Sequence, residues 1–254
     1  GHARGKGRRR FEGFAMGSGE LSQEAFRQFL SQAFDRAVSS MTDGGIAMVF
    51  MDWRHLADAM AAGDGRFSEL LNLCVWAKTN AGMGSLYRSQ HELVLVWKVG
   101  KASHVNNIDL GRFGRWRSNV WRYAGANAFG PERDDLLELH PTVKPVVMLA
   151  DAILDVTAVG DVVFDPFAGS GSTLVAAEKT GRRGRGIEID PAYVDVAVRR
   201  LERFTGTQAR HAESGLTFDE TATARTVAGS VFSTSVNLPQ PLPRVRLKAG
   251  RRAM

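Results

Sequence analysis

Residues 162–173, V-V-F-D-P-F-A-G-S-G-S-T, combine residue types that could bind a nucleotide-like cofactor. The apolar run Val162–Phe164 predicts a strand that is buried on both faces. Gly169 and Gly171 allow a tight turn and a close approach of the backbone to a ligand, and Ser172 can cap the helix that follows. Together these features favour a nucleotide-type site, although a plain strand-to-helix turn has the same local pattern.

An acidic residue and an upstream polar segment accompany this loop. Glu188 stands 19 positions after Gly169, within the predicted strand Arg185–Asp190. This offset is close to the roughly 20 residues at which an acid ending the second strand reaches a pair of ribose hydroxyls. The alternative is an acid that is merely solvated. Upstream, the segment His140–Pro145, H-P-T-V-K-P, leads into a predicted helix with its proline in the first turn.

The elements that must position these residues alternate between helix and strand. Apolar periodicity predicts helices at residues 21–38, 55–62, 146–156, 173–181 and 192–204, and strands at residues 46–51, 70–76, 91–97, 162–164 and 185–190. This order predicts an α/β fold with a doubly wound, mostly parallel sheet and helices on both faces. Ligands bind to such sheets where the strands end.

One internal segment, residues 100–133, interleaves basic and aromatic side chains in a way that suits contact with nucleic acid. Its basic residues are Lys101, Arg112, Arg115, Arg117, Arg122 and Arg133, and its aromatic residues are Phe113, Trp116, Trp121, Tyr123 and Phe129. Basic residues contact phosphates and aromatic rings stack on bases. The alternative is an irregular segment whose aromatic side chains pack on the domain.

Composition excludes several classes of protein. The total charge is +6, of which residues 1–10 contribute +5 and residues 205–254 contribute +4, so residues 11–204 carry −3. The high isoelectric point therefore does not by itself indicate binding to a polyanion. No apolar stretch reaches the ~20 residues of a membrane span, and the basic N-terminus lacks the apolar part of a signal peptide, so we expect a cytoplasmic protein. The single cysteine, Cys74, excludes an internal disulfide and a multi-cysteine metal site; we expect a buried thiol and no metal.

Several motifs together resemble the S-adenosylmethionine-dependent amino-methyltransferases of DNA, which methylate adenine N6 or cytosine N4. The motifs are D165-P-F-A-G-S-G-S-T, G186-I-E-I-D, H140-P-T-V-K-P, F14-A-M-G-S-G-E-L-S, M51-D-W-R-H, W76-A-K-T-N-A-G-M-G-S-L-Y-R-S-Q-H-E and N119-V-W-R-Y. They extend from Gly13 to about Phe204. The order is similar to the permuted arrangement of that family, in which the catalytic half precedes the cofactor half.

The resemblance implies a Rossmann-like methyltransferase fold and S-adenosylmethionine, rather than NAD, as cofactor. In this family Asp165 would lie near the methionine portion, Glu188 would hold the ribose hydroxyls, and Thr142 and Lys144 would line the methionine side. The cofactor-binding residues it implies are Thr142, Lys144, Asp165, Pro166, Phe167, Gly169, Ser170, Gly171, Thr173, Glu188 and Asp190. For double-stranded DNA, we expect contacts from Arg112, Arg115, Trp116, Arg117 and Arg122.

One departure from the family concerns the catalytic tetrapeptide, which is Asp, Asn or Ser, then Pro-Pro, then an aromatic residue. None of the eight prolines adjoins another, so residues 1–254 hold no such tetrapeptide. We expect the catalytic motif upstream of Gly1, and hence little methyl transfer by this chain alone.

The expected organisation is a methyltransferase domain at residues 1–204, truncated at its N-terminus, and a disordered basic tail at residues 205–254. Within the domain, residues 100–139 form the candidate DNA-recognition segment and residues 140–204 the cofactor half. Adenine N6 is the expected target, in a monomer or homodimer. Two alternatives stay open: methylation of RNA or of a protein amide, and a non-catalytic protein that binds S-adenosylmethionine or DNA.

Overall fold

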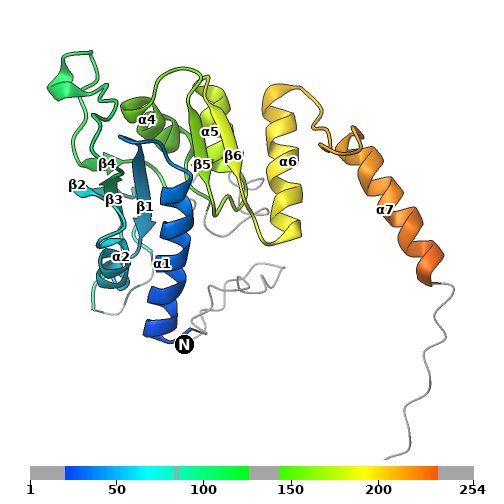
Figure 1. Ribbon diagram of the computed structural model, residues 1–254, viewed down its shortest axis with the longest axis horizontal. Coiled ribbons are helices and arrows are strands. Elements are labelled where there is room, and N and C mark those ends of the chain that lie inside the picture. Colours follow the sequence, from blue (N-terminus) through cyan, green and yellow to red (C-terminus); the bar gives the residue numbers. More distant parts are fainter. Residues whose placement is uncertain (1–20, 83, 85, 126–142, 234–254) are drawn as a thin grey trace, which may run out of the picture. The chain divides into compact units, whose positions relative to one another are not determined.

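The computed structural model describes residues 21–82, 84, 86–125 and 143–233 (Figure 1). The described chain divides into two units, Gly1–Gly206 and Thr207–Met254. The first unit holds α1 (Gln23–Ser39), β1 (Ile46–Met51), α2 (Leu56–Gly63), β2 (Glu69–Ala77), β3 (His91–Lys98), η1 (Asp109–Gly111), β4 (Val120–Arg122), α4 (Val146–Val156), β5 (Val162–Asp165), α5 (Ser172–Lys179), β6 (Arg183–Gly186) and α6 (Pro191–Thr205). The motif at Phe14, the segment His140–Thr142 and Arg133 lie outside the described residues.

The strands form two sheets within the first unit. Four strands pair in the order β1-β3-β2-β4, and β5 pairs with β6. The predicted α/β class is confirmed, but the expectation of a mostly parallel sheet needs one correction. β3 is antiparallel to both β1 and β2, whereas the pairs β2/β4 and β5/β6 are parallel. The reason is that β2 and β3 are joined by a loop without a crossover helix, which allows only a hairpin.

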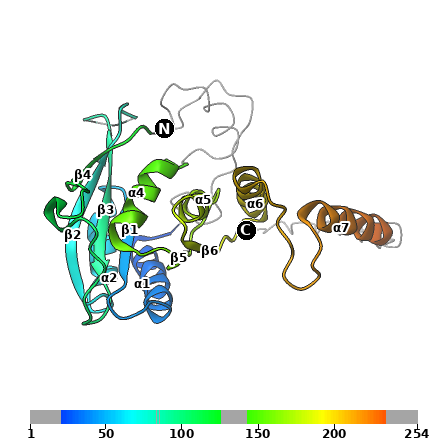
Figure 2. The same cartoon turned by 90° about the horizontal axis from the view of Figure 1, so that it is seen from above.

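Helices cover both faces of the four-stranded sheet, as expected. On β3, Val94 and Val96 face a core that contains Met148 of α4, whereas Leu95 and Trp97 face a core that contains Phe34 of α1. This alternation follows from the two-residue repeat of a strand. In Figure 2, β1 lies between α4 on one side and α1 on the other. Each apolar face of the sheet is therefore buried against a helix.

Cys74 of β2 belongs to the core that also holds Met148, and its thiol is buried. Burial raises the pKa of this thiol to about 11, because the surrounding apolar groups disfavour the thiolate. The expectation of a buried structural thiol is confirmed.

Two expectations about burial and disorder were wrong. β5 is not buried on both faces: Val163 packs against the core, but Val162 is 52% exposed. The tail is not wholly irregular, because residues Phe218–Ser233 form helix α7. The backbone N–H of Glu220 donates to the Thr217 hydroxyl, and the Glu220 carboxylate accepts from the N–H of Thr217. This reciprocal pair is a capping box, which stabilises the start of a helix.

The strand register and two ring contacts define which loops share one end of the molecule. β1 ends beside the start of β3, since Met51 pairs with Leu93, and β2 ends beside it too, since Ala77 pairs with His91. His55, which follows β1, contacts Phe26 of α1 at 5.0 Å between ring centroids. One turn further along α1, Phe29 contacts Phe167, which follows β5, at 5.9 Å. The strands β1, β2 and β5 all finish at this end of the first unit, which we call the cofactor end.

Candidate cofactor site

Asp165 ends β5 and fixes the turn that follows. One carboxylate oxygen accepts from the backbone N–H of Phe167 at 3.0 Å, and the other accepts from the hydroxyl of Thr173 at 2.6 Å. The side chain thus connects the last residue of the strand to the first turn of α5 across the loop. Because these two bonds tie both sides of the loop to one carboxylate, they favour a single shape of the loop.

Glu188, which follows β6, closes the other side of the same loop. Its carboxylate accepts from the backbone N–H of Gly169 at 2.7 Å and from that of Asp190 at 2.9 Å. The fold thus brings the glycine loop and this acid together, and the binding of ribose hydroxyls by Glu188 stays a prediction. Each carboxylate oxygen has two lone pairs, so both retain capacity to accept a further hydrogen bond from a ligand.

The two glycines of the loop serve different purposes. Gly169 has φ 52° and Gly171 has φ 77°, conformations that side chains other than glycine rarely adopt. A Cβ on Gly171 would lie 2.8 Å from the Cβ of Ala197 on α6. Gly171 is therefore needed for the packing of α6, and the approach of its backbone to a cofactor stays a prediction. Gly171, rather than Ser172, is also the residue that precedes the first turn of α5.

Arg200 of α6 holds the loop through hydrogen bonds, and the sequence analysis did not predict it. Arg200 donates to the carbonyl of Ser170 at 2.7 Å and to the hydroxyl of Ser172 at 3.1 Å. Burial lowers the pKa of this guanidinium, and the charge of Arg203 adds to that effect. Asp190 caps α6 by accepting from the N–H of Ala192 at 2.9 Å. No local pattern distinguishes Arg200 from the other basic residues of its helix.

Apolar side chains surround the acid of this site and face solvent. Phe167, Ile187 and Ile189 are all exposed, on either side of the bond between Glu188 and Gly169. Exposed apolar side chains around a few fixed polar groups are typical of ligand sites. Pro166 and Phe167 lie in the turn after β5, as expected. Lys144 places its ammonium 5.1 Å from the ring of Phe50 on β1, while Thr142 lies outside the described residues.

The structure divides the residues that were expected to contact DNA. Arg115 and Arg117 pair with Asp155 of α4, which is 3% exposed, at 2.7 and 3.0 Å. Burial lowers the pKa of Arg117, but Asp155 and Tyr123 outweigh this effect and raise it. These two guanidinium groups stabilise the fold rather than project toward a partner. Arg112, Trp116 and Arg122 are exposed.

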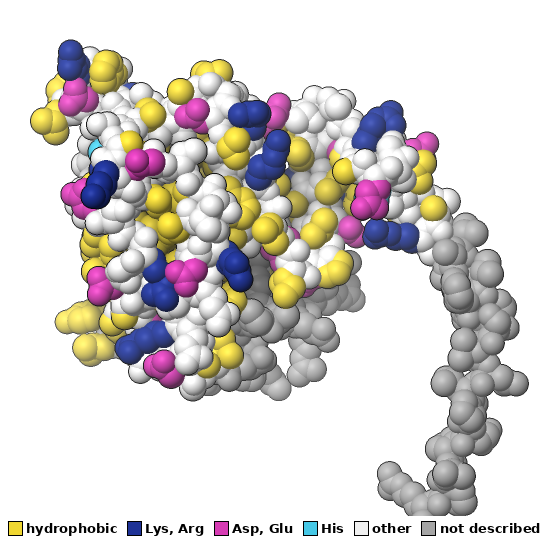
Figure 3. All heavy atoms as spheres, in the orientation of Figure 1, with side chains coloured by type: hydrophobic (Ala, Val, Ile, Leu, Met, Phe, Trp, Pro, Cys, Tyr) yellow, Lys and Arg dark blue, Asp and Glu magenta, His cyan; other side chains and the backbone are white. Residues whose placement is uncertain are grey.

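Residues 104–118 lie far from the cofactor end. They follow β3, which runs antiparallel to β1, so the segment starts beside Ile46, where β1 begins. In Figure 1 the green segment projects from the end of the sheet opposite the first turn of α1. Figure 3 shows yellow, blue and magenta side chains on this projection. Arg112 and Trp116 are thus candidates for contacts away from the reacting base, and Arg122 alone lies near the end of β4 that approaches the site.

The comparison with protein families identifies the chain. A family described as DNA methylase, N6_N4_Mtase, matches residues 8–199. The chain belongs to this DNA methylase family. The resemblance inferred from the motifs is confirmed, and the loop between β5 and α5 lies within the matched region of the methylase.

Individual relatives of this methylase agree in fold. The type II methyltransferase M2.DpnII of Streptococcus pneumoniae is 33% identical over 142 residues, which make up 53% of this chain and 52% of the relative. The chain thus spans about half the length of that relative. TTHA0409 of Thermus thermophilus, solved in complex with S-adenosyl-L-methionine, matches with a TM-score of 0.56 and 22% identity, over 76% of this chain and 80% of that one.

A third relative is the cytosine-N4-specific PvuII DNA methyltransferase, with a TM-score of 0.59 and 16% identity over 78% of this chain and 79% of that one. The Rossmann-like methyltransferase fold is confirmed. No helix in the described part of this methylase is long and apolar enough to cross a membrane.

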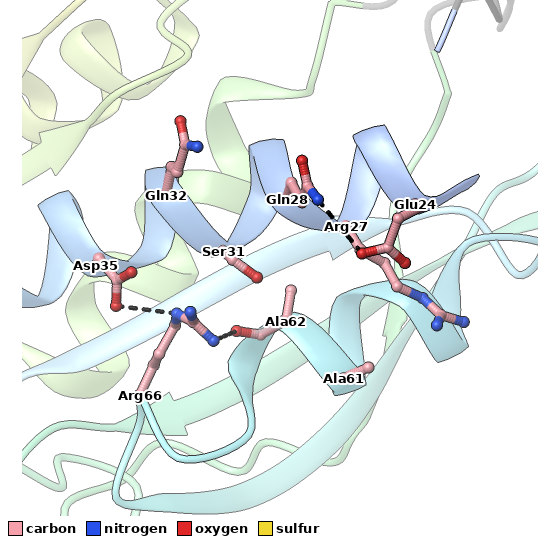
Figure 4. A pocket seen from close by; sticks show the side chains of 9 residues that line it. All are labelled: Glu24, Arg27, Gln28, Ser31, Gln32, Asp35, Ala61, Ala62 and Arg66. Carbon is pink, nitrogen blue, oxygen red and sulfur yellow. Dashed lines mark hydrogen bonds and ion pairs between the residues drawn. The ribbon is translucent and has the colours of Figure 1, made fainter. Parts of the chain in front are cut away.

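A polar hollow elsewhere on the methylase is not the cofactor site. It lies between α1 and α2, where Figure 4 shows Asp35 paired with Arg66 and Glu24 bonded to Gln28. The Asp35–Arg66 pair is 2.9 Å long. Its charged groups already have partners, and none of the residues that line it belongs to the loop between β5 and α5. We therefore assign no ligand to it.

Proposed function

We propose that this chain binds S-adenosylmethionine at the loop between β5 and α5, and that the whole protein methylates an exocyclic amine of a DNA base. The observation that supports the cofactor assignment best is the bond between Glu188 and the N–H of Gly169. It joins the ends of two parallel strands at the point where α/β sheets bind nucleotides. Membership of the DNA methylase family supports the reaction and the substrate.

The residues of the site fit the chemical parts of the cofactor. The free lone pairs of Glu188 suit two ribose hydroxyls, and the exposed side chains of Phe167 and Ile189 suit the faces of an adenine ring. Asp165 and Lys144 would lie toward the methionine portion. When bound, the cofactor supplies an electrophilic sulfonium methyl group. The residues of this chain would position that methyl group and exclude water around it.

The acceptor requires residues of another kind. The lone pair of an exocyclic amine is delocalised into the base, so the amine needs hydrogen-bond acceptors that concentrate electron density on its nitrogen. In the family a Pro-Pro tetrapeptide supplies them, and residues 1–254 contain no such sequence. We propose that this chain binds the cofactor but transfers little methyl by itself, and that adenine N6 is the target of the whole protein. The absence of the tetrapeptide also favours a second candidate, a protein that binds cofactor and DNA without catalysis.

The cofactor assignment predicts the effect of two substitutions on binding of S-adenosylhomocysteine. Asp165→Ala and Glu188→Ala should each weaken binding roughly tenfold or more, because each removes a charged acceptor from the site. Isothermal calorimetry measures the affinity. Glu178→Ala, at an exposed acid on α5, is the matched control and should bind as the unchanged chain does. Equal affinity in all three variants would remove the assignment.

A loss of binding could also arise from a collapsed loop rather than a lost contact. Glu188→Gln keeps an oxygen that can accept from Gly169, but its amide nitrogen would meet the N–H of Asp190, which the second carboxylate oxygen accepts in the unchanged chain. The melting temperature without ligand is therefore measured for each variant. A variant that keeps its melting temperature but loses affinity for S-adenosylhomocysteine has lost a contact, whereas one that loses both has lost the shape of the loop.

A further inference from the structure

The loop between β2 and β3, residues 78–90, presents two large apolar side chains to solvent. Leu86 is 85% exposed and Tyr87 is 84% exposed. Contact of these two side chains with water is unfavourable in free energy, and no other described part of the first unit buries them. Both residues lie beyond the ends of β2 and β3, and therefore at the cofactor end.

Hydrogen bonds within the loop hold this tip in a defined shape. The backbone N–H of Gly82 donates to the carbonyl of Ser89 at 2.7 Å, and the N–H of Lys78 donates to that of Gln90 at 2.8 Å. The guanidinium of Arg88 donates to the carbonyls of Ala81 and Gly82 at 2.9 and 3.1 Å. Hydrogen bonds between the two sides of the loop thus support the segment that carries Leu86 and Tyr87.

Gly84 shows how tightly the tip is folded. It forms an antiparallel bridge with Arg88, and a Cβ at this position would lie 2.0 Å from the carbonyl oxygen of Tyr87. Any side chain here would push the two sides of the tip apart. The sequence therefore maintains a narrow turn directly behind the exposed apolar pair.

The charges of the loop suit a polyanion. Residues 78–91 contain Lys78 and Arg88 but no Asp or Glu. Lys78 is paired with Glu92 at 2.5 Å, which leaves the exposed guanidinium of Arg88 as the positive group beside the apolar pair. At the neighbouring turn after β1, Arg54 lies 4.8 Å from the ring of the exposed Trp53. A protein partner of acidic character or a nucleic acid could meet such a surface, and its position favours the second.

That position lies at the same end of the first unit as the cofactor loop. β2 is separated from β1 by one strand, and adjacent strands lie about 4.8 Å apart, so the last residue of β2 lies roughly 10 Å from the end of β1. His55, which follows β1, contacts α1 at Phe26, and Phe167 of the cofactor loop contacts the same helix at Phe29. A duplex whose target base reaches the cofactor would dock at this same end of the first unit, and therefore on the side that carries Leu86 and Tyr87.

We propose that Leu86 and Tyr87 form a wedge that enters double-stranded DNA at the target base and occupies the space vacated when that base leaves the stack. This inference rests on the proposed function, since a base must leave the duplex before its amine can be methylated. Apolar side chains are used in this way by proteins that unstack DNA, where they replace part of the lost stacking. Arg88 contacts a phosphate beside the wedge.

The test compares two duplexes of one sequence, one fully paired and one with a central abasic site, by fluorescence anisotropy with saturating S-adenosylhomocysteine. The unchanged chain should bind the abasic duplex roughly tenfold more tightly, because the space is already open. The double variant Leu86→Ala/Tyr87→Ala should lose this preference, whereas Tyr87→Phe should keep it because the ring still stacks.

The matched control is Leu110→Ala/Phe113→Ala, which removes a leucine and an aromatic residue of similar exposure, 91% and 60%, at the opposite end of the sheet. It should retain the preference. All four side chains are exposed, so the melting temperatures should not change.

The outcomes separate the wedge from the function on which it rests. If the unchanged chain binds DNA but shows no preference, or if the double variant keeps the preference, the wedge is overturned and the tip is a protein-docking surface instead. If the chain binds neither duplex, both the wedge and the assignment of DNA as substrate are overturned.

Discussion

Asp58 shows how one buried charge is accommodated in this fold. It is 2% exposed, at the start of α2, and accepts from Arg27 at 2.7 Å and from Gln23 at 3.0 Å, both on α1. The hydrogen bond from Arg27 is the main reason that the pKa of Asp58 is lowered, and it outweighs the opposing effect of burial. The pair joins α1 to α2 beneath the turn that carries His55.

This lowered pKa predicts a pH-dependent loss of stability. Asp58→Asn should reduce the free energy of unfolding by about 2 kcal/mol at neutral pH, because a charged acceptor is lost. A lowered native pKa stabilises the fold above the unfolded value of about 3.9, and that contribution vanishes as the pH falls through the native pKa. The two proteins should therefore converge in acid.

Urea denaturation at a series of pH values measures this difference. Asp64→Asn, at an exposed acid that ends α2, is the control and should match the unchanged chain throughout. A constant difference between Asp58→Asn and the unchanged chain at every pH would contradict the explanation.

At the scale of elements, α4 is joined to the segment before β4 by a buried polar network. Asp155 accepts from Arg115 at 2.7 Å and from Arg117 at 3.0 Å, and Arg117 also donates to the hydroxyl of Tyr123 at 2.7 Å. Tyr123 in turn donates to Asp151 at 2.5 Å. Burial and the bond to Asp151 raise the pKa of this tyrosine, so it stays protonated and donates at neutral pH.

Removal of the central acid should therefore destabilise the fold strongly. We expect Asp155→Ala to lower the free energy of unfolding by about 3–5 kcal/mol, because two guanidinium groups lose a partner where little water can replace it. Arg112→Ala, at an exposed arginine of the same segment, should change it by less than about 0.5 kcal/mol. Equal effects of the two substitutions in urea denaturation would show that the network is dispensable.

At the scale of the whole molecule, the chain contains a cofactor loop but no Pro-Pro tetrapeptide. We expect the 254-residue protein to incorporate little labelled methyl into DNA while it binds S-adenosylhomocysteine, since positioning of the cofactor alone does not activate the amine. Mass spectrometry of hydrolysed DNA distinguishes N6-methyladenine from N4-methylcytosine. Salt-resistant transfer by this chain would contradict the expectation, and the modified base would show whether adenine is the target.

Sequence and structure agree best where the interaction is local. The turn between β5 and α5 and the helical face of Leu30 and Phe34 follow from residues close in the chain, and the contact of Gly169 with Glu188 follows from a motif of fixed spacing. Composition predicts a disordered tail at residues 205–254, because composition does not register the reciprocal hydrogen bonds of Thr217 and Glu220 that begin α7.

The sequence by itself therefore determined the α/β class, the turn between β5 and α5 and the family, because these depend on periodicity and on motifs of fixed spacing. Only the tertiary structure decided which basic residues are free. Arg117 meets Asp155 38 positions away, and Arg200 meets Ser170 30 positions away, and no local pattern encodes such contacts. The antiparallel course of β3 likewise put residues 104–118 at one end of the sheet and Leu86 and Tyr87 at the other. Charge and aromatic content point to residues 100–133, whereas strand direction places residues 78–90 at the cofactor end.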